Sequence, residues 1–214
     1  MKNIIFDLGD VLIPIDLTAP RRHFAHLANL PETEVAARWN QHDIGSRYER
    51  GLLTDAAFRA AIRAVLFPEN NVPGPTDADL DAAWNAVLLD VPLENFERVR
   101  ALAGRYRLFL LSNTNALHIR EVNRRLAALG LPTLETFFER VYYSHQTGLL
   151  KPDPASFGQV LTEGGLVANE TFFFDDNLSN IRAAAALGIR AVQVCSPHTI
   201  LTYLNEALPP DFVL

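Results

Sequence analysis

The stretch NIIFDLGD, residues 3–10, decides the fold of this chain. It begins with a short apolar run, Asn3–Phe6, of the kind that forms a parallel strand covered on both faces. Asp7 follows this run directly. Ligands of open α/β sheets bind at the carboxyl ends of the strands, so Asp7 is either a functional carboxylate or an ordinary turn or capping residue. The rest of the sequence has to decide between these interpretations.

Further short apolar runs predict more strands of the same kind. They are Arg107–Leu111, Thr171–Phe174 and Arg190–Val194, with a weaker one at Val141–Tyr143. After residue 90, segments with apolar residues at three- and four-residue spacing alternate with these runs and predict helices. These helices are Leu93–Ala103, Ala116–Leu129, Pro154–Glu163, Leu178–Leu187 and Thr199–Ala207. The alternation predicts an α/β fold built on a Rossmann-like, doubly wound parallel sheet.

The segment after the first strand has a different pattern. Residues 17–90 contain no convincing strand and indicate several short helices, one of them Asp55–Leu66 with Thr54 as its N-cap. Pro, Asn and Gly predict a loop at Pro68–Thr76. We therefore expect residues 1–16 and 91–214 to form the core and residues 17–90 to form an inserted α-helical cap.

Composition limits the kinds of partner that this chain can have. Of its 214 residues, 49% are hydrophobic and 21% are charged, which is ordinary for a globular protein. The formal net charge of −6 disfavours nucleic acid and anionic membranes as partners, since both attract clustered Lys and Arg. The single cysteine, Cys195, excludes an internal disulfide and follows an apolar strand, so we expect a small buried hydrophobic residue.

The N-terminal residues do not resemble a secretory signal. Asp7 and Asp10 interrupt the apolar run near the N-terminus, whereas a signal needs a longer apolar segment and a small-residue cleavage site. No stretch approaches the ~20 apolar residues that a transmembrane helix needs. We therefore expect a cytoplasmic protein.

Polar residues follow three of the predicted strands. Asp7 follows the first, Ser112 and Asn113 follow the second, and Asp175 and Asp176 follow the run that begins at residue 171. Burying three carboxylates beside a core is costly unless they are paired or bind a cation. Carboxylate oxygens are the hard ligands that Mg²⁺ prefers. The sequence therefore predicts a magnesium site formed by the three aspartates.

A lysine completes a set of groups suited to phosphoryl transfer. Lys151, in GLLKPDP, lies just before a predicted helix. Asp7 could attack phosphorus and form an aspartyl-phosphate. The Ser112 hydroxyl and the Lys151 ammonium would then hold the other phosphoryl oxygens and neutralise their charge in the transition state. Alone, Lys151 would be a surface charge and Asp175–Asp176 a helix N-cap; their joint occurrence in this order favours a function.

Taken together, these motifs resemble those of the haloacid dehalogenase-like superfamily. The matching segments, in order along the chain, are FDLGDVL, LLSNT, GLLKPDP and FFFDDNLSNIRAAAALG. The resemblance implies that Asp7 is both the nucleophile and a metal ligand, and that Gly9 binds the metal through its backbone carbonyl. It implies direct coordination by Asp176, with Asp175 acting directly or through metal-bound water.

The resemblance also implies which residues bind phosphate. Ser112 and Lys151 match the family's phosphate-binding residues, and Asn113 would contribute its backbone N–H. Asn180, four residues after Asp176, either supports the metal ligands or is a plain helix-surface residue.

Within the superfamily, the chain is most similar to bacterial phosphatases that act on α-D-glucose 1-phosphate. They share the DLG-x-V start and segments like Arg50–Phe58 and Leu111–His118 of this chain. The similarity implies a magnesium-dependent phosphatase of a small phosphate ester, namely a sugar phosphate such as a hexose 1-phosphate.

One position departs from the pattern of most phosphatases of the superfamily. They carry a second Asp two positions after the nucleophile, which protonates the leaving group, and here that position is Gly9. Asp10 comes next, but successive residues point in different directions, so we do not expect it to substitute. General acid–base catalysis is typically worth ~10²–10⁴-fold. The glycine therefore favours substrates such as anomeric phosphates, unless a cap residue or an ordered water donates the proton.

The predicted cap should select the substrate. Its most polar cluster either recognises sugar hydroxyls or is an exposed helix face with charges at i,i+4 spacing. The cluster consists of His42, Asp43, Arg47, Tyr48 and Glu49. Asp16 lies near the expected hinge. We expect Trp39 and Trp84 in the hydrophobic core and His145 on a loop surface.

Three alternatives remain on the same fold, and the oligomeric state stays open. A 2-haloacid dehalogenase also has a nucleophilic Asp without the second Asp, but that subfamily lacks an acidic pair like Asp175–Asp176. A non-catalytic phosphometabolite-binding protein is suggested by Gly9. A phosphomutase depends more heavily on the missing acid–base Asp.

Overall fold

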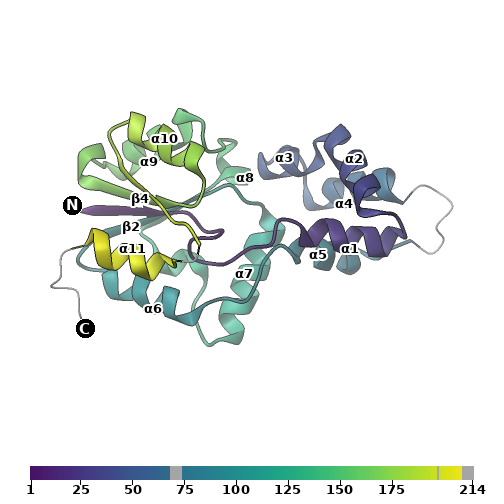
Figure 1. Cartoon of the computed structure of the whole chain (residues 1–214), viewed down its shortest axis with the longest axis horizontal. Coiled ribbons are helices and arrows are strands. Elements are labelled where there is room, and N and C mark those ends of the chain that lie inside the picture. Colours follow the sequence, from purple (N-terminus) through teal and green to yellow (C-terminus); the bar gives the residue numbers. More distant parts are fainter. Residues whose placement is uncertain (68–73, 197, 209–214) are drawn as a thin grey trace.

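A parallel β-sheet forms the centre of the larger part of the molecule (Figure 1). The computed structural model describes residues 1–67, 74–196 and 198–208. Within these ranges the sheet has five strands in the order β3-β2-β1-β4-β5. The strands are β1 (Asn3–Phe6), β2 (Arg107–Ser112), β3 (Arg140–Tyr143), β4 (Thr171–Asp175) and β5 (Arg190–Gln193). The predicted α/β fold with a parallel sheet is confirmed.

The central strand shows why these apolar runs become strands. All four residues of β1 are buried, because helices cover both faces of the sheet. Ile4 and Phe6 belong to the hydrophobic cluster on one face, and Ile5 belongs to the cluster on the other. This alternation follows from the two-residue period of a strand.

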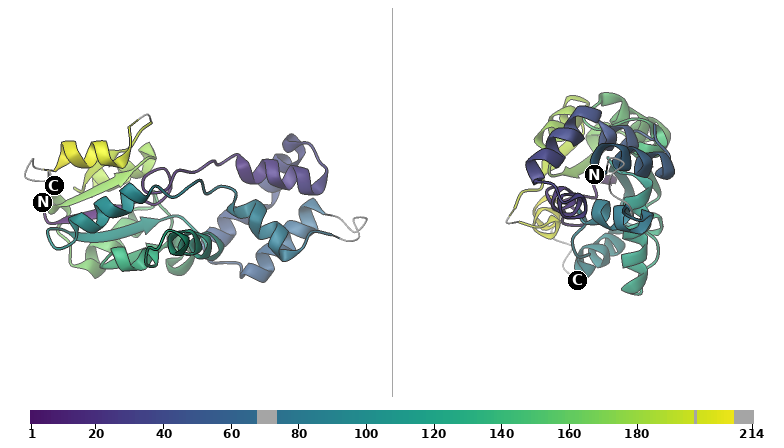
Figure 2. Two further views of the ribbon diagram at one scale, coloured as in Figure 1. Left: turned by 90° about the horizontal axis from the view of Figure 1, so that it is seen from below. Right: turned by 90° about the vertical axis from the view of Figure 1, so that its right-hand side faces the viewer.

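The helices after residue 90 divide between the two faces of the sheet, as Figures 1 and 2 show. One face is covered by α6 (Leu93–Leu102), α7 (Ala116–Ala128) and α11 (Ile200–Ala207). The other is covered by α9 (Pro154–Gly164) and α10 (Leu178–Ala186). The short helix α8 (Ser144–Thr147) directly follows β3, and 3₁₀ turns lie at Leu134–Phe137 and Ala168–Glu170. Among the described residues, no helix is both long and apolar enough to cross a membrane.

Five helices form a separate helical insertion between β1 and α6 in the described part of the chain. They are α1 (Ala19–Ala28), α2 (Glu32–His42), α3 (Ile44–Glu49), α4 (Asp55–Leu66) and α5 (Asp77–Asn85). The insertion has its own hydrophobic cluster, which Leu117 of α7 joins. The Thr54 hydroxyl accepts a hydrogen bond from the backbone N–H of Ala57, which confirms the predicted N-cap. Of the predicted loop at Pro68–Thr76, residues 68–73 lie outside the described residues.

Two extended segments connect the insertion to the sheet and lie side by side (Figure 2). Asp16 donates its backbone N–H to the carbonyl of Val87 at 2.8 Å, and Leu89 donates to the carbonyl of Pro14 at 3.0 Å. The insertion therefore lies beyond the carboxyl ends of the strands, next to the residues that follow them. We propose that these segments are the boundaries of the predicted cap.

The prediction for Cys195 was wrong. Strand β5 ends at Gln193, before the cysteine, and Cys195 is exposed. Val194 is buried in the hydrophobic cluster and Val192 packs against it, but the chain leaves the cluster before Cys195. An apolar run shows that a strand is buried but does not show where the chain turns outward.

Candidate active site

Three carboxylates meet at the carboxyl edge of the sheet. Phe6 of β1 lies opposite Phe174 of β4, so the residues that follow, Asp7 and Asp175, are neighbours. The backbone N–H of Asp7 donates to the carbonyl of Phe174 at 2.9 Å. One carboxylate oxygen from each of Asp7, Asp175 and Asp176 lies within 4.8 Å of the others. The structure thus brings together the three carboxylates among the predicted metal ligands.

Lys151 is buried between two of these aspartates, although lysines are usually solvated. Its residue is 4% exposed, and its Nζ lies 2.8 Å from Asp7 Oδ1 and 2.6 Å from Asp175 Oδ2. The alternative of a surface charge is therefore wrong for Lys151. A buried ammonium that already faces two carboxylates is placed to face a phosphoryl group attached to Asp7.

Asn113 holds Lys151 in place through its side chain. Its Nδ2 donates to the Lys151 carbonyl, and its Oδ1 accepts from the Lys151 backbone N–H, both at 2.8 Å. The sequence suggested only a backbone contribution from Asn113, because nothing in a linear sequence pairs positions that are 38 residues apart. Ser112, the last residue of β2, is buried beside them.

Asp175 is fixed by amide groups as well as by Lys151. Asn180 donates from Nδ2 to both carboxylate oxygens at 3.0 Å, and the backbone N–H of Asn177 donates to Oδ1 at 2.8 Å. Asn180 is buried, so it supports the acidic pair and is not a helix-surface residue. Asn177, and not the acidic pair, caps α10 by accepting from the backbone N–H of Ser179.

The site holds more negative than positive charge. Burial raises the pKa of Asp7 to about 7, the charge of Lys151 opposes this shift, and the charge of Asp175 adds to it. Burial and the neighbouring charges of Asp175 and Asp10 also raise the pKa of Asp176. Burial alone would lower the pKa of Lys151, but Asp7 and Asp175 raise it. Three carboxylates face a single ammonium, so negative charge is in excess. The carboxylate oxygens are hard donors, and they fit a divalent cation such as Mg²⁺.

Gly9 and Asp10 differ in what surrounds them. A Cβ atom at Gly9 would lie 3.1 Å from Ile15 Cδ1, so Ile15 occupies part of the space that a second Asp would need. Asp10 has a left-handed backbone with φ 51°, and its Oδ1 accepts from the Ile15 backbone N–H at 2.9 Å. Asp10 thus stabilises its own turn, which agrees with the expectation that it does not replace the missing acid.

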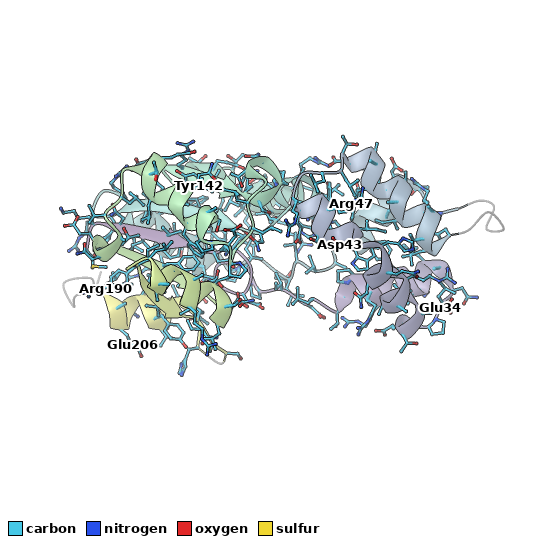
Figure 3. All side chains as sticks on the ribbon, turned by 90° about the horizontal axis from the view of Figure 1, so that it is seen from above. Glu34, Asp43, Arg47, Tyr142, Arg190 and Glu206 are labelled. Carbon is cyan, nitrogen blue, oxygen red and sulfur yellow. The ribbon has the colours of Figure 1, made fainter. Side chains whose placement is uncertain are left out.

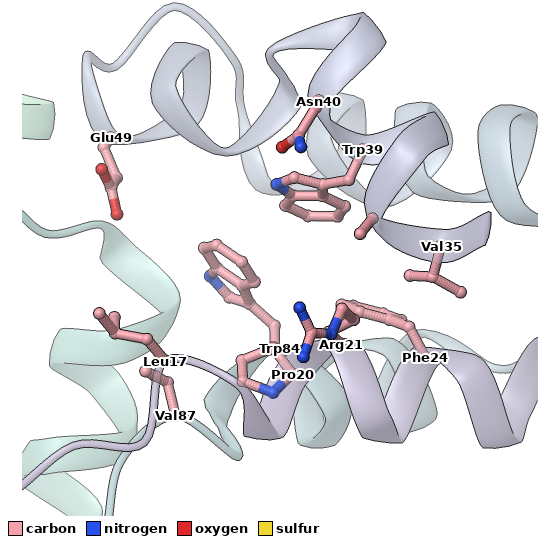
Figure 4. Close-up of a pocket in the computed structure, with 11 residues that line it drawn as sticks. Leu17, Pro20, Arg21, Phe24, Val35, Trp39, Asn40, Glu49, Trp84 and Val87 are labelled. Carbon is pink, nitrogen blue, oxygen red and sulfur yellow. The ribbon is translucent and has the colours of Figure 1, made fainter. Parts of the chain in front are cut away.

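The insertion encloses a cavity of about 330 Å³ (Figure 4). Its lining is largely apolar, with few polar side chains. The lining residues are Leu17, Pro20, Arg21, Phe24, Val35, Ala36, Trp39, Asn40, Glu49, Trp84 and Val87. Trp39 and Trp84 stack at 5.4 Å between ring centroids, so they belong to the hydrophobic cluster and also form a wall of the cavity.

Of the polar cluster predicted in the cap, only Glu49 lines this cavity. His42 and Arg47 line a different surface hollow, and Figure 3 shows Asp43 and Arg47 on the surface of the insertion. Tyr48 is buried and donates its hydroxyl to Asp55 Oδ1 at 2.5 Å. The cluster was a single group in sequence, but its members lie on different faces.

His145 was expected on a loop surface, and this was wrong. It is half-buried on α8, and its Nδ1 lies 3.2 Å from the carbonyl oxygen of Thr114. Ser144 next to it both accepts from the backbone N–H and donates to the carbonyl of Thr114. Helix α8 therefore fixes the loop that follows Ser112.

Comparisons with known proteins identify the family. The family model described as haloacid dehalogenase-like hydrolase matches residues 1–188. The chain is 28% identical over 194 residues to the D-ribitol-5-phosphate phosphatase of Bacteroides thetaiotaomicron, covering 90% of this chain and 91% of that protein.

Solved structures agree with this result. A HAD family enzyme of Bacteroides thetaiotaomicron, in complex with magnesium and inorganic phosphate, is 30% identical with a TM-score of 0.81, over 92% of this chain and 96% of that chain. A HAD-like family hydrolase from Porphyromonas gingivalis is 26% identical with a TM-score of 0.85, over 97% of each chain. The L-2-haloacid dehalogenase of Xanthobacter autotrophicus is 19% identical with a TM-score of 0.59, over 97% of this chain and 82% of that chain, which shows the common fold alone.

Fold and site together define a metal-dependent phosphoryl-transfer enzyme, and the chain belongs to the haloacid dehalogenase-like hydrolase family. The predicted enzyme class, a phosphatase of this family, is confirmed. The predicted cofactor, Mg²⁺, is confirmed by the magnesium complexes of a relative and by the acidic triad of this chain. The finer likeness to α-D-glucose 1-phosphate phosphatases stays a prediction.

Proposed function

We propose that this enzyme hydrolyses the phosphate monoester of a small polyol, a pentitol phosphate such as ribitol 5-phosphate, through an aspartyl-phosphate on Asp7. The observation that carries the proposal is the buried contact of Lys151 with both Asp7 and Asp175 beside the third carboxylate. The choice of polyol is supported by the relative that is a D-ribitol-5-phosphate phosphatase and aligns along nearly the whole chain. A pentitol replaces the hexose 1-phosphate that the sequence motifs suggested.

The residues divide the chemistry between them. Asp7 attacks phosphorus, so that the bond to the leaving oxygen breaks as the bond to the Asp7 carboxylate forms. Lys151 and the Ser112 hydroxyl hold the equatorial oxygens, where charge spreads in the transition state. Asp7, Asp175 and Asp176, with the Gly9 carbonyl, would hold Mg²⁺, which when bound supplies further positive charge to these oxygens. Water then hydrolyses the aspartyl-phosphate.

The helical insertion acts as the cap in this proposal. Its cavity of about 330 Å³ has room for a five-carbon polyol, and its polar lining residues Arg21, Asn40 and Glu49 can hydrogen-bond hydroxyl groups. Inorganic phosphate, the second product, would leave when the insertion moves away from the sheet.

The test compares turnover of ribitol 5-phosphate, glucose 1-phosphate and para-nitrophenyl phosphate, each with Mg²⁺ and with EDTA. We expect Mg²⁺-dependent turnover that Asp7→Asn abolishes while the far-UV spectrum is unchanged. Asp10→Asn is the matched control, because asparagine also tolerates the left-handed backbone, and it should keep activity within about threefold. More than a tenth of wild-type activity in Asp7→Asn would rule out this nucleophile. Tight phosphate-ester binding without turnover would instead favour a binding protein.

A further inference from the structure

A pentitol phosphate creates a chemical demand that Gly9 cannot meet. The leaving group is a primary alcohol. Its alkoxide is a poor leaving group, so the oxygen needs a proton in the transition state. Close to Asp7, the ammonium of Lys151 is already paired with Asp7 and Asp175. A protein group that donates the proton has to lie on the side of the leaving alcohol, which in the proposed function is the side of the insertion.

Glu49 is the acidic residue among those that line the cavity of the insertion. It is the last residue of α3, and its side chain lines the cavity of the insertion. Figure 4 shows its carboxyl pointing toward the end of the cavity where Leu17 and Val87 lie, in the two segments that lead back to the sheet. Within the described ranges, no hydrogen bond or ion pair engages this carboxyl. A carboxyl aimed into a mostly apolar cavity without a partner is available to a ligand.

The turn after Glu49 is docked directly on the core. Gly51 has φ 71°, and a Cβ atom there would overlap the carbonyl oxygen of His145, so only glycine permits this close approach. His145 in turn contacts the Thr114 carbonyl, two residues after Ser112. These contacts place the turn that follows Glu49 against helix α8, which fixes the loop after Ser112.

An ion pair holds the same segment from its other end. Asp55, at the start of α4, pairs with Arg120 of α7 at 2.5 Å, which joins the insertion to the core a few residues beyond Gly51. Both ends of the turn are therefore fixed to the sheet domain, and Glu49 does not depend on a free loop for its position.

The surroundings leave a large fraction of Glu49 protonated near neutral pH. Burial raises the pKa of Glu49 to about 7. Of the charged groups around it, Arg21 of α1 is paired with Glu32 at 3.1 Å, and Arg50 is exposed. On α8, burial lowers the pKa of His145, so that this ring is neutral. Among the residues that the structure describes, no neighbouring cation therefore holds the carboxyl in its ionised form.

We propose that Glu49 donates a proton to the leaving-group oxygen and is thereby the acid that Gly9 does not provide. This proposal rests on the proposed function. As the P–O bond of the ester breaks, its oxygen takes the proton of Glu49 and leaves as the alcohol. In the second step water attacks phosphorus and the bond to Asp7 breaks. The phosphate product keeps the protons of that water, and the Glu49 carboxylate regains its proton from solvent. Each turnover thus returns Glu49 to its acid form.

Two substrates with different leaving groups test the role of Glu49. Glu49→Gln keeps the size and hydrogen-bonding capacity of the side chain but cannot donate this proton. We expect kcat for ribitol 5-phosphate to fall about 10²-fold or more, while kcat for para-nitrophenyl phosphate, whose leaving group needs no proton, changes less than threefold. Glu34→Gln, on the surface of the insertion, is the matched control and should change neither value.

The pH dependence gives a second, independent readout. An acid must be protonated to act, so wild-type kcat/KM for ribitol 5-phosphate should decline above a pH of about 7. This decline should be absent with para-nitrophenyl phosphate and absent in Glu49→Gln. Equal losses on both substrates in Glu49→Gln, or no loss on either, would overturn the proposal.

The same experiment separates this proposal from the proposed function. Mg²⁺-dependent wild-type turnover of para-nitrophenyl phosphate that requires Asp7 supports the phosphatase whatever Glu49 does. Para-nitrophenyl phosphate turnover by Glu49→Gln also shows that the variant is folded. If the wild type turns over neither substrate, the proposed function fails and the role of Glu49 fails with it.

Discussion

Replacing Lys151 by methionine tests the buried charge arrangement on which the site depends. The side chain of Lys151 is 1% exposed, and its Nζ is the shared cation of Asp7 and Asp175. Methionine keeps a long unbranched side chain of similar volume, so packing changes little and the loss of charge dominates. The chain offers a matched control in its other lysine, Lys2, which pairs with Glu170 at 2.9 Å and has a side chain that is 70% exposed.

The two substitutions should differ several-fold in their effect on the free energy of unfolding. Removing one partner of a buried pair costs about 3–5 kcal/mol, because it leaves an uncompensated charge. An exposed pair is worth about 0.2–1 kcal/mol. We therefore expect Lys151→Met to lose about 3–5 kcal/mol without metal and Lys2→Met to lose less than about 1 kcal/mol. Saturating Mg²⁺ should recover part of the first loss, because a bound cation neutralises Asp7 and Asp175 in place of the ammonium.

Urea unfolding at pH 8 in EDTA, followed by circular dichroism, measures both losses. Lys151 lowers the pKa of Asp7, so without it the folded-state pKa of Asp7 rises further above its unfolded value. The destabilisation is therefore greatest at high pH and should shrink as the pH is lowered to 5 and Asp7 takes up a proton. Equal unfolding free energies for Lys151→Met and Lys2→Met would refute the buried triad. A loss that does not change between pH 8 and pH 5 would show that packing, and not charge, is responsible.

Two further predictions concern His118 and Gly9. The ring of His118 stacks on Trp84, and burial lowers its pKa to about 4. In the unfolded chain the pKa of this histidine is near 6.5. Between pH 6.5 and pH 4 the unfolded chain therefore binds a proton that the folded chain does not bind. Stability should fall by about 3 kcal/mol more in the wild type than in His118→Asn between pH 7 and pH 4 in urea titrations, and parallel curves would contradict this. Gly9→Asp should lower the free energy of unfolding by about 1 kcal/mol, because the new side chain crowds Ile15. Adding Ile15→Val to this variant should restore the stability in thermal melts. A double variant that is no more stable than Gly9→Asp would contradict the contact.

The sheet and its polar edge could be predicted because both depend on local sequence. A run such as Thr171–Phe174 has no stable place except a buried strand, and parallel strands bring their carboxyl ends to one edge. Once the strands were identified, Asp7, Asp175 and Ser112 had to be neighbours. The order β3-β2-β1-β4-β5 then places the nucleophile on the central strand.

Other features could not be predicted because they depend on contacts between distant segments. In sequence Asn113 is typical of a turn residue. In the structure its side-chain amide makes two hydrogen bonds with the backbone of Lys151. Gly51 reads as an ordinary turn glycine, and only the carbonyl of His145 on the facing helix explains why no larger residue fits there. Periodicity indicates which face of a helix is buried but not what that face meets.

Moving the acid from position 9 in the core to Glu49 on the insertion would change when the acid can act. An acid two residues after the nucleophile is fixed in the core, whether or not the insertion is docked. Gly51, two residues after Glu49, rests against His145 of the core, so the proposed donor would reach the leaving oxygen only while this contact is made. If Glu49 is the donor, protonation of an alcohol and enclosure of that alcohol become one event, and an alkyl phosphate is cleaved only when the cavity has closed around it. An aryl phosphate, which needs no proton, would be cleaved without that closure, so its turnover should be the less sensitive of the two to changes at the docking turn.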